Sequence, residues 1–219
     1  NSPPAIDYFS AFTRNPVTDA APFLPSFVIP YRNRMVYGAG DRVYISDPFD
    51  YQKISEDQHV QFLPGRETVV TAFTYRDGNL YLVGETGTFS LNDNGDVPAT
   101  WAGPALVDGH FGTLAQNGVD RDASSNDIAM ASNSGLRIFA DGSFDKIPLT
   151  DWFPDWERIN WVAASTIELY DFVVEQTIYV LVPLDDATTP SHVFSFNYTD
   201  GKTADKVKAS TDVISGRYC

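Results

Sequence analysis

The chain has 219 residues, of which 43% are hydrophobic and 14% aromatic, which is ample for a core of its own. Its net charge of −14 and its lack of Lys and Arg clusters exclude tight binding to a nucleic-acid backbone. No apolar run reaches the roughly 18 residues of a membrane-spanning helix, and the one cysteine, Cys219, excludes an internal disulfide and a Cys-based metal site.

The two ends of the sequence differ from its middle. Prolines recur through residues 1–26 and exclude a continuous helix there. Tyr and Phe side chains lie between these prolines, so we expect an extended amino-terminal arm that lies on a surface. Residues 202–219 carry few aromatic side chains and predict a carboxyl-terminal tail that leaves the fold. The folded part is therefore expected over residues 27–201.

Four strand-pair patterns recur along the folded part at a spacing of roughly 37 to 50 residues, a period typical of propeller blades. They cover residues 35–46, 71–84, 126–139 and 168–183. Aligned on the inner strand, the equivalent positions are Tyr44, Tyr81, Ala129 and Tyr179. One blade cannot bury both faces of its sheet, so blades stack on their neighbours. The sequence therefore predicts an all-β fold of β-propeller blades, about four of them recognisable, with extended terminal arms.

Turn residues set the limits of the expected strands. The clearest is Asp77-Gly78, because both central residues of a type I′ turn need positive φ. The expected strands are 35–37 and 43–46 in the first blade, 71–75, 80–83 and 88–91 in the second, 128–131, 136–139 and an outer strand at 112–116 in the third, and 168–173, 177–182 and 193–197 in the fourth.

Segment 151–161, DWFPDWERINW, is the one place where we expect a helical turn. Asp155 is expected to cap its first amides. Trp152 and Trp156 have two interpretations: they pack over a blade edge, or they form an exposed aromatic patch that binds a partner. Together with Trp101 they are the candidate partner contacts of the chain.

Residue patterns that would indicate chemistry are weak. The three histidines, His59, His110 and His192, lack the spacing of a zinc site, and no Gly-x-Ser-x-Gly elbow occurs. The oxygen-rich segments 92–96 and 120–127 lack the twelve-residue frame of an EF-hand and are more simply polar loops. The sequence therefore predicts no catalytic residue, no metal and no cofactor, and the chain is not expected to be an enzyme.

Several strings resemble blades of virion propellers from tailed bacteriophages. RMVYGAGDRVYISDPFDYQ (34–52) is similar to a blade in which an Arg-hydrophobic-x-Gly strand precedes an (I/V)-Y-x-S-(D/P) strand and an aromatic-bearing Asp-Pro turn. DGNLYLVGETGTFSL (77–91), SNSGLRIFADG (132–142) and residues 168–201 are similar to the blades that follow. Blade order and local strings carry this resemblance, over roughly residues 27 to 201, and catalytic residues do not.

The resemblance implies a tail nozzle, hub or packaged-DNA stabilisation protein of a short-tailed phage, assembled in the host cytoplasm and located in the virion. The implied partners are copies of itself in a ring, other tail or portal-adaptor proteins, and DNA that passes without specific binding; no membrane span is expected. The acidity then has two interpretations, simple solubility or a negative wall that repels the DNA backbone.

Two other functions stay open at this point. The chain could be a receptor- or glycan-binding propeller module, in which exposed Trp101 and Trp152 at blade-top loops stack on sugar rings. It could also be a glycosidase or lyase on a propeller scaffold. Abundant carboxylates give little support for that chemistry, because some pair always falls at a suitable separation.

Overall fold

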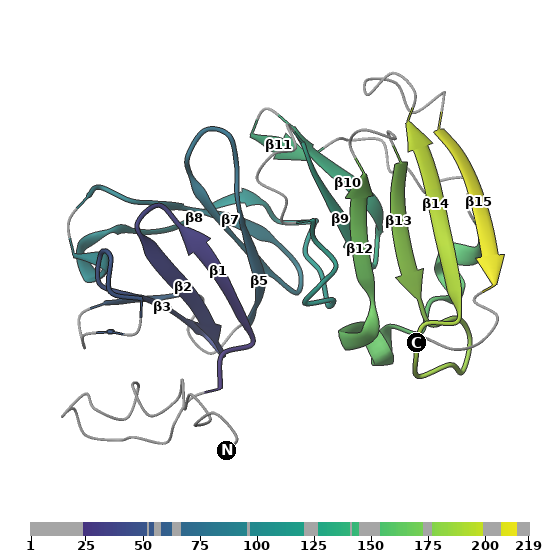
Figure 1. Ribbon diagram of the computed structural model, residues 1–219, viewed down its shortest axis with the longest axis horizontal. Helices are drawn as coiled ribbons and strands as arrows, with labels where there is room; N and C mark the ends of the chain where they lie inside the picture. Colours follow the sequence, from purple (N-terminus) through teal and green to yellow (C-terminus); the bar gives the residue numbers. More distant parts are fainter. Residues whose placement is uncertain are drawn as a thin grey trace, which may run out of the picture.

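The computed structural model describes residues 24–51, 53–54, 58–62, 67–95, 97–120, 127–140, 142–144, 154–172, 177–198 and 207–213. These residues form four antiparallel sheets, three of four strands and one of three, which follow one another along the chain (Figure 1). The fold is thus nearly all β and built of propeller blades, as predicted. The arm expected over residues 1–26 lies outside the described residues up to residue 23.

Each sheet is a meander whose neighbours in sequence are neighbours in space. The first sheet contains β1 (Phe27–Tyr31), β2 (Arg34–Ala39), β3 (Arg42–Ile45) and β4 (His59–Gln61). The second contains β5 (Val69–Thr74), β6 (Leu80–Gly84), β7 (Thr88–Asn92) and β8 (Ala102–Asp108). The third contains β9 (Ile128–Ser132), β10 (Gly135–Ala140) and β11 (Ser143–Phe144), and the fourth β12 (Glu168–Phe172), β13 (Thr177–Val182), β14 (His192–Tyr198) and β15 (Val207–Val213).

The tight turns that the sequence marked are present. Gly40, between β2 and β3, and Gly78, between β5 and β6, both have positive φ, at 60° and 77°. The Asp77 carboxylate stabilises the second turn by accepting the backbone N–H of Asn79 at 2.9 Å. The predicted central hairpins of the first and second sheets are therefore confirmed.

The outer strand expected at 112–116 is wrong. This segment is not a strand but a link between two sheets: the Thr113 N–H donates to the Gly84 carbonyl at 3.0 Å, and the Thr113 hydroxyl donates to the Ala131 carbonyl at 2.6 Å. Val119 instead forms an antiparallel bridge with Met130 beside β9. Gly112 permits the close approach, because a Cβ there would overlap the backbone of Gly84 and Glu85.

In the fourth sheet, β12, β13 and β14 match the predicted strands. The expectation that the chain leaves the blade beyond Gly201 is wrong for β15, which pairs with β14 from Tyr198–Val207 to His192–Val213. VKASTDV has little apolar alternation, which is why the sequence did not mark it as a strand, and its place in the sheet is given by its backbone pairing with β14.

Two 3₁₀ helices, η3 (Pro154–Arg158) and η4 (Trp161–Thr166), follow the third sheet, and η2 (Pro98–Thr100) precedes β8. The helical turn predicted at 151–161 is confirmed in part by η3. Asp155 lies inside η3 rather than ahead of it, so its expected capping role is wrong. Asn160 caps η4 instead, accepting the Val162 N–H at 3.2 Å.

Three apolar cores lie between successive sheets. In β6 and β9 every residue is buried, because alternate side chains enter different cores. Leu80 and Leu82 of β6 pack on the first sheet, whereas Tyr81 and Val83 pack on the third. A third core joins the third sheet to the fourth, where Ala129 belongs to the same cluster as Ile178 and Phe194. Both interior sheets are thus buried on both faces.

The alignment of inner-strand positions needs one correction. Tyr81 and Tyr179 lie on β6 and β13, each the second strand of its sheet. Ala129 lies on β9, which pairs with β10 on one side and is bonded to Val119 and Asp120 on the other, so it too is an inner position. Tyr44 lies on β3, the third strand. The reason is that β1, FVIPY, carries a proline and escaped recognition as the first strand of its sheet.

Gly38 on β2 lies opposite Phe27 on β1, and a Cβ added to Gly38 would overlap the Phe27 ring. We expect Gly38→Ala to lower the free energy of unfolding by about 1–3 kcal/mol, since the ring must leave its place in the core. Gly103→Ala on β8 is the matched control, because a Cβ there meets open space. Urea unfolding measures both; equal loss in the two variants would contradict the role given to the Phe27 ring.

Candidate functional site

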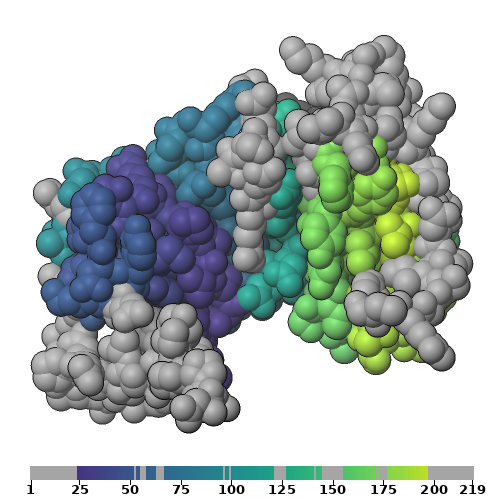
Figure 2. Space-filling view, viewed as in Figure 1, coloured from purple at the N-terminus to yellow at the C-terminus, as the bar shows by residue number. Residues whose placement is uncertain are grey.

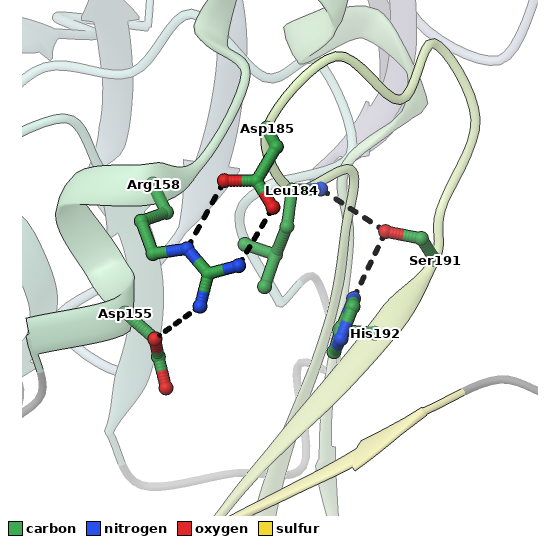
Figure 3. A network of polar contacts seen from close by, with 6 residues as sticks. All are labelled: Asp155, Arg158, Leu184, Asp185, Ser191 and His192. Atoms are coloured by element: carbon green, nitrogen blue, oxygen red, sulfur yellow. Dashed lines mark hydrogen bonds and ion pairs between the residues drawn. The ribbon is translucent and has the colours of Figure 1, made fainter.

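A polar network fixes η3 to the loop between β13 and β14 (Figure 3). The Arg158 guanidinium binds Asp185 through two hydrogen bonds, Nε to Oδ1 at 3.0 Å and Nη2 to Oδ2 at 2.6 Å, and binds Asp155 through Nη1 at 2.8 Å. Backbone bonds support it: the Asp185 N–H donates to the Arg158 carbonyl, and the Asn160 N–H donates to Pro183. The planar guanidinium matches a carboxylate in this bidentate way.

The charges of this network stabilise each other. The hydrogen bond from Arg158 holds the pKa of Asp185 below its ordinary value, and the hydrogen bonds to Asp185 and Asp155 raise the pKa of Arg158. All three side chains are well exposed, so solvent weakens the pair and its effect is local. The network positions a loop and does not create an unusual protonation state.

Ser191 and His192 lie at the end of the same loop. The Ser191 hydroxyl accepts the Leu184 N–H at 3.1 Å and lies 3.0 Å from His192 Nδ1. Catalytic Ser-His sets need a carboxylate that orients the imidazole, but in Figure 3 the Asp185 carboxylate is turned toward Arg158. The contacts of Ser191 with Leu184 and His192 therefore hold the end of this loop at the start of β14.

A second set of polar contacts links the first and second sheets. Arg32, which has a positive φ of 50°, forms an ion pair with Asp93 at 2.7 Å. The Tyr31 hydroxyl donates to the Gly78 carbonyl at 3.3 Å. Within the second sheet, the Tyr81 hydroxyl donates to Asp77 of the same turn at 2.6 Å. Burial is the main cause that raises the pKa of both tyrosines to about 12.

The fourth sheet has one face turned away from the third sheet, here called the end face. Tyr170 is 47% and Phe172 48% exposed, and the Phe172 and Tyr179 rings contact each other edge to face at 5.5 Å. The register places Tyr170 opposite Tyr179 and Glu168 opposite Leu181. The register therefore puts aromatic and aliphatic side chains on this face together with polar ones. From β12 to β14 its residues are Glu168, Tyr170, Phe172, Thr177, Tyr179, Leu181, Val193 and Ser195.

The first sheet likewise has a face turned away from the second sheet, here called the front face. The register puts Val28, Pro30, Met35, Tyr37, Ala39, Arg42, Tyr44, His59 and Gln61 on this side, although Tyr37 is only 8% exposed. Val28 is 40% exposed, and the neighbouring loop adds Phe49, which is 76% exposed. The Tyr37 hydroxyl ties this loop to the sheet by donating to the Tyr51 carbonyl at 2.5 Å. Figure 2 shows the first sheet, in purple and blue, and the last, in green and yellow, at opposite ends of the molecule.

The structure separates the three tryptophans named as candidate contacts. Trp101 is 5% exposed in the core between the first and second sheets, 6.2 Å from the Tyr31 ring. Its expected exposure for stacking on sugars is therefore wrong, because η2 directs the ring inward. Trp156 is also 5% exposed, and its indole N–H donates to the Ser132 carbonyl at 3.0 Å, so its packing interpretation is the correct one. Trp152 lies outside the described residues.

Within the described ranges, no group of three or more His, Cys, Asp or Glu side chains could hold a metal ion. In the segment 92–96, Asp93 binds Arg32 and the Gly95 N–H; most of the segment 120–127 lies outside the described residues. No helix in the described part has the length and apolar character needed to cross a membrane. Sequence reasoning missed the end face, although Tyr170, Phe172 and Tyr179 alternate with core residues in the printed sequence.

We expect Arg158→Lys to loosen the loop that carries Asp185, because lysine cannot make the bidentate contact. Hydrogen exchange at the Asp185 and Ala187 amides should be modestly faster, while exchange in β13 should not change. Arg42→Lys is the control, since the ion pair that the structure describes for Arg42 is a 4.0 Å contact with the adjacent Asp41 on another sheet. Molar salt should reduce the difference between wild type and variant; unchanged exchange at both loop amides would argue against the clamp.

Stability should fall at alkaline pH because of Tyr31 and Tyr81. Their folded pKa of about 12 lies above the unfolded value of about 10. Their contribution is therefore complete below about pH 10 and is lost as the pH rises through about 12. Urea midpoints across this range, with tyrosinate absorbance measured in parallel, check it. Tyr81→Phe should make the fall less steep; an identical slope would be inconsistent with this assignment.

No model of a known protein family matches the sequence, and no curated protein sequence matches it. Among solved structures, the N-terminal domain of Nup159 has a TM-score of 0.48 and 11% identity over 85% of this chain and 47% of that chain. An auxiliary nutrient binding protein from Bacteroides ovatus has 0.46 and 8% over 90% and 43%. PorZ, a surface component of the type-IX secretion system of Porphyromonas gingivalis, has 0.41 and 12% over 89% and 26%.

These three neighbours are β-propeller-like proteins. This chain spans less than half the length of each of them. The four stacked antiparallel sheets, rather than these scores, carry the fold assignment for the chain.

Proposed function

We propose that this chain is a structural protein of a bacteriophage tail or neck, a ring-forming nozzle or hub component that lines or closes the DNA exit channel. Its role in this proposal is geometric rather than catalytic. The observation that carries it is the row of packed sheets whose end sheets expose apolar side chains within the described residues, Val28 at one end and Tyr170 and Phe172 at the other. Such a molecule has a rigid body and two surfaces on which neighbours can pack.

Rigidity comes from ties that cross the sheet boundaries. Thr113 joins the second and third sheets through its amide and hydroxyl. Trp156 joins η3 to the third sheet through its indole N–H, and its ring also packs against Phe194 and Phe196 of the fourth. Because interiors are close-packed, a load on one sheet is passed to the next. A component of a DNA conduit needs that property.

The strings that resemble phage propellers coincide with central hairpins. Residues 34–52 cover β2, β3 and the loop that follows, and residues 77–91 cover β6 and β7 up to Leu91. Residues 132–142 include β10, and residues 168–201 include β12 to β14. This coincidence supports the resemblance, because the similar strings are strands and turns of the packed blades rather than surface loops.

The acidity suits a passage for DNA. The first strands of the first two sheets, β1 and β5, carry no charged residue, so the carboxylates of these sheets lie on later strands and in loops. With a net charge of −14, the molecule as a whole repels a phosphate backbone within about one Debye length, roughly 8 Å at physiological salt. DNA could then pass without being held.

The test uses particles of a phage that encodes this chain. We expect the chain to co-purify with intact particles in constant ratio to the major capsid protein, and a gold-labelled antibody to mark the tail or neck. A replication protein from the same genome is the control and should be absent. Recovery of the chain only from the particle-free lysate would contradict the proposal. Band-shift assays with duplex DNA should show no complex even at low salt.

A further inference from the structure

We propose that Asn117-Gly118 is a site of spontaneous modification, at which asparagine converts to aspartate and isoaspartate through a cyclic succinimide. The reaction proceeds only when the third and fourth sheets separate at this point, and the isoaspartate product weakens their junction. This inference concerns the segment that joins two sheets, residues 113–119, here called the link. It holds or fails independently of where the chain acts.

Asparagine followed by glycine is the pair in which this conversion is easiest, because glycine has no side chain to hinder its own nitrogen. The chain contains two such pairs, Asn94-Gly95 and Asn117-Gly118. Both asparagines are exposed, so water reaches both side-chain amides. The two sites therefore differ mainly in how the fold holds the backbone.

The reaction at Asn117 needs only water and hydroxide. The Gly118 backbone nitrogen loses its proton and attacks the Asn117 side-chain carbonyl carbon, Cγ, and the new bond closes the succinimide ring. The bond between Cγ and the side-chain nitrogen breaks, and that nitrogen takes up a proton and leaves as ammonia. Water then opens the ring at either carbonyl. One opening gives aspartate, and the other gives isoaspartate, whose backbone runs through the former side chain.

The fold holds the attacking nitrogen in place. The Gly118 N–H donates to the Ala115 carbonyl at 3.0 Å. Gly118 is buried, and a Cβ built on it would lie 2.6 Å from the Ala115 Cβ, so the backbone is tightly packed here. The Thr113 hydroxyl fixes this turn, accepting the Ala115 N–H at 3.0 Å and donating to the Ala131 carbonyl at 2.6 Å. The nitrogen can therefore attack only after the link has left its place.

Different sheets hold the carbonyls on the two sides of this nitrogen. The Asn117 carbonyl accepts the Leu169 N–H of β12 at 3.0 Å, and the Gly118 carbonyl accepts the Ala131 N–H of β9 at 2.7 Å. Asn117 also forms a parallel bridge with Glu168. The reacting nitrogen thus lies between the two carbonyls that join the fourth sheet to the third. Local opening of this link, rather than unfolding of the whole chain, is the event that frees it.

Isoaspartate cannot restore the link. Its backbone contains one additional carbon atom before Gly118, and the carbonyl that accepted the Leu169 N–H becomes part of a free carboxylate. The acceptors for β12 and β9 are then no longer at the spacing that both sheets require. The new negative charge also lies across the bridge from Glu168, and like charges on paired residues are destabilising. Conversion therefore keeps the junction from closing again.

Asn94-Gly95 provides a reference within the same chain. It lies between β7 and η2, where the Gly95 N–H donates to the Asp93 carboxylate at 2.7 Å and the Asn94 side-chain amide donates to the Thr100 carbonyl at 3.3 Å. Neither contact involves the third or the fourth sheet. The rate of conversion at Asn94 therefore does not depend on the link.

The first test measures conversion at both sites in the folded chain. The protein is kept at mildly alkaline pH, and tandem mass spectrometry of its peptides gives the converted fraction at Asn94 and Asn117 over time. Thr113→Val removes the hydroxyl that holds the link and should speed conversion at Asn117 by about 5- to 30-fold, with no change at Asn94. Thr68→Val is the matched control, since its hydroxyl contacts Glu85 outside the link, and it should change neither rate.

A second measurement needs no variant, and circular dichroism checks that Thr113→Val stays folded. In wild type, conversion at Asn117 should be slower than in the urea-unfolded chain by the open fraction that hydrogen exchange gives for the Leu169 amide. Equal rates at Asn117 in the folded and the unfolded chain would overturn the proposal. So would a folded Thr113→Val variant that converts at the wild-type rate, or one that speeds both sites equally.

The effect of the product is tested in an Asn94→Gln background, where Asn117 is the only Asn-Gly site. Ion exchange separates the converted chain, and an isoaspartate methyltransferase labels the isoaspartate form. This form should unfold at a lower urea concentration than Asn117→Asp in the same background, which has the charge without the longer backbone. An isoaspartate chain as stable as Asn117→Asp would overturn the effect proposed for the longer backbone.

Discussion

Burial of the interior sheets on both faces is the constraint on which the rest of this structure depends. A strand sends alternate side chains to opposite sides, so every residue of β6 and β9 can be buried only if a sheet lies on each side of them. Each large apolar side chain buried in this way contributes about 1.5–3 kcal/mol. No sheet is stable alone, and the stack forms because each sheet completes the core of its neighbour.

The connections between sheets follow from the same packing. A segment that joins two sheets can form hydrogen bonds with both of them. Thr113 does so, since its N–H donates to the Gly84 carbonyl of the second sheet and its hydroxyl donates to the Ala131 carbonyl of the third. Trp156 fills the corner between the third and fourth sheets and uses its one polar atom on a backbone carbonyl. The Arg158 network lies outside this core and acts on a single loop. Packing therefore provides the rigidity, and surface ion pairs only orient the edges.

The two ends of the stack are where the molecule differs from a closed fold. Tyr170, Phe172 and Val28 belong to the same alternating pattern as the core residues, but each is 40% exposed or more. Apolar surface of this kind marks a place where another surface packs. The proposed function starts from this property.

Alternation and turn chemistry in the sequence were sufficient to predict the central hairpins, β2 and β3, β5 to β7, β9 and β10, and β12 to β14. They did not reveal β1, β4, β8, β11 or β15. These strands carry a proline, are very short, or have little apolar alternation, and their position comes from pairing with a neighbour.

The sequence by itself determined an all-β chain of repeated thin sheets, because periodicity and turns are local properties. Only the tertiary structure decided which aromatic side chains are buried. Trp101 lies in a core, whereas Tyr170 lies on an exposed face, and nothing in their local sequence distinguishes them. The reason is physical: the side of a strand that faces solvent depends on whether another sheet lies against it, and that is set by the order of the stack.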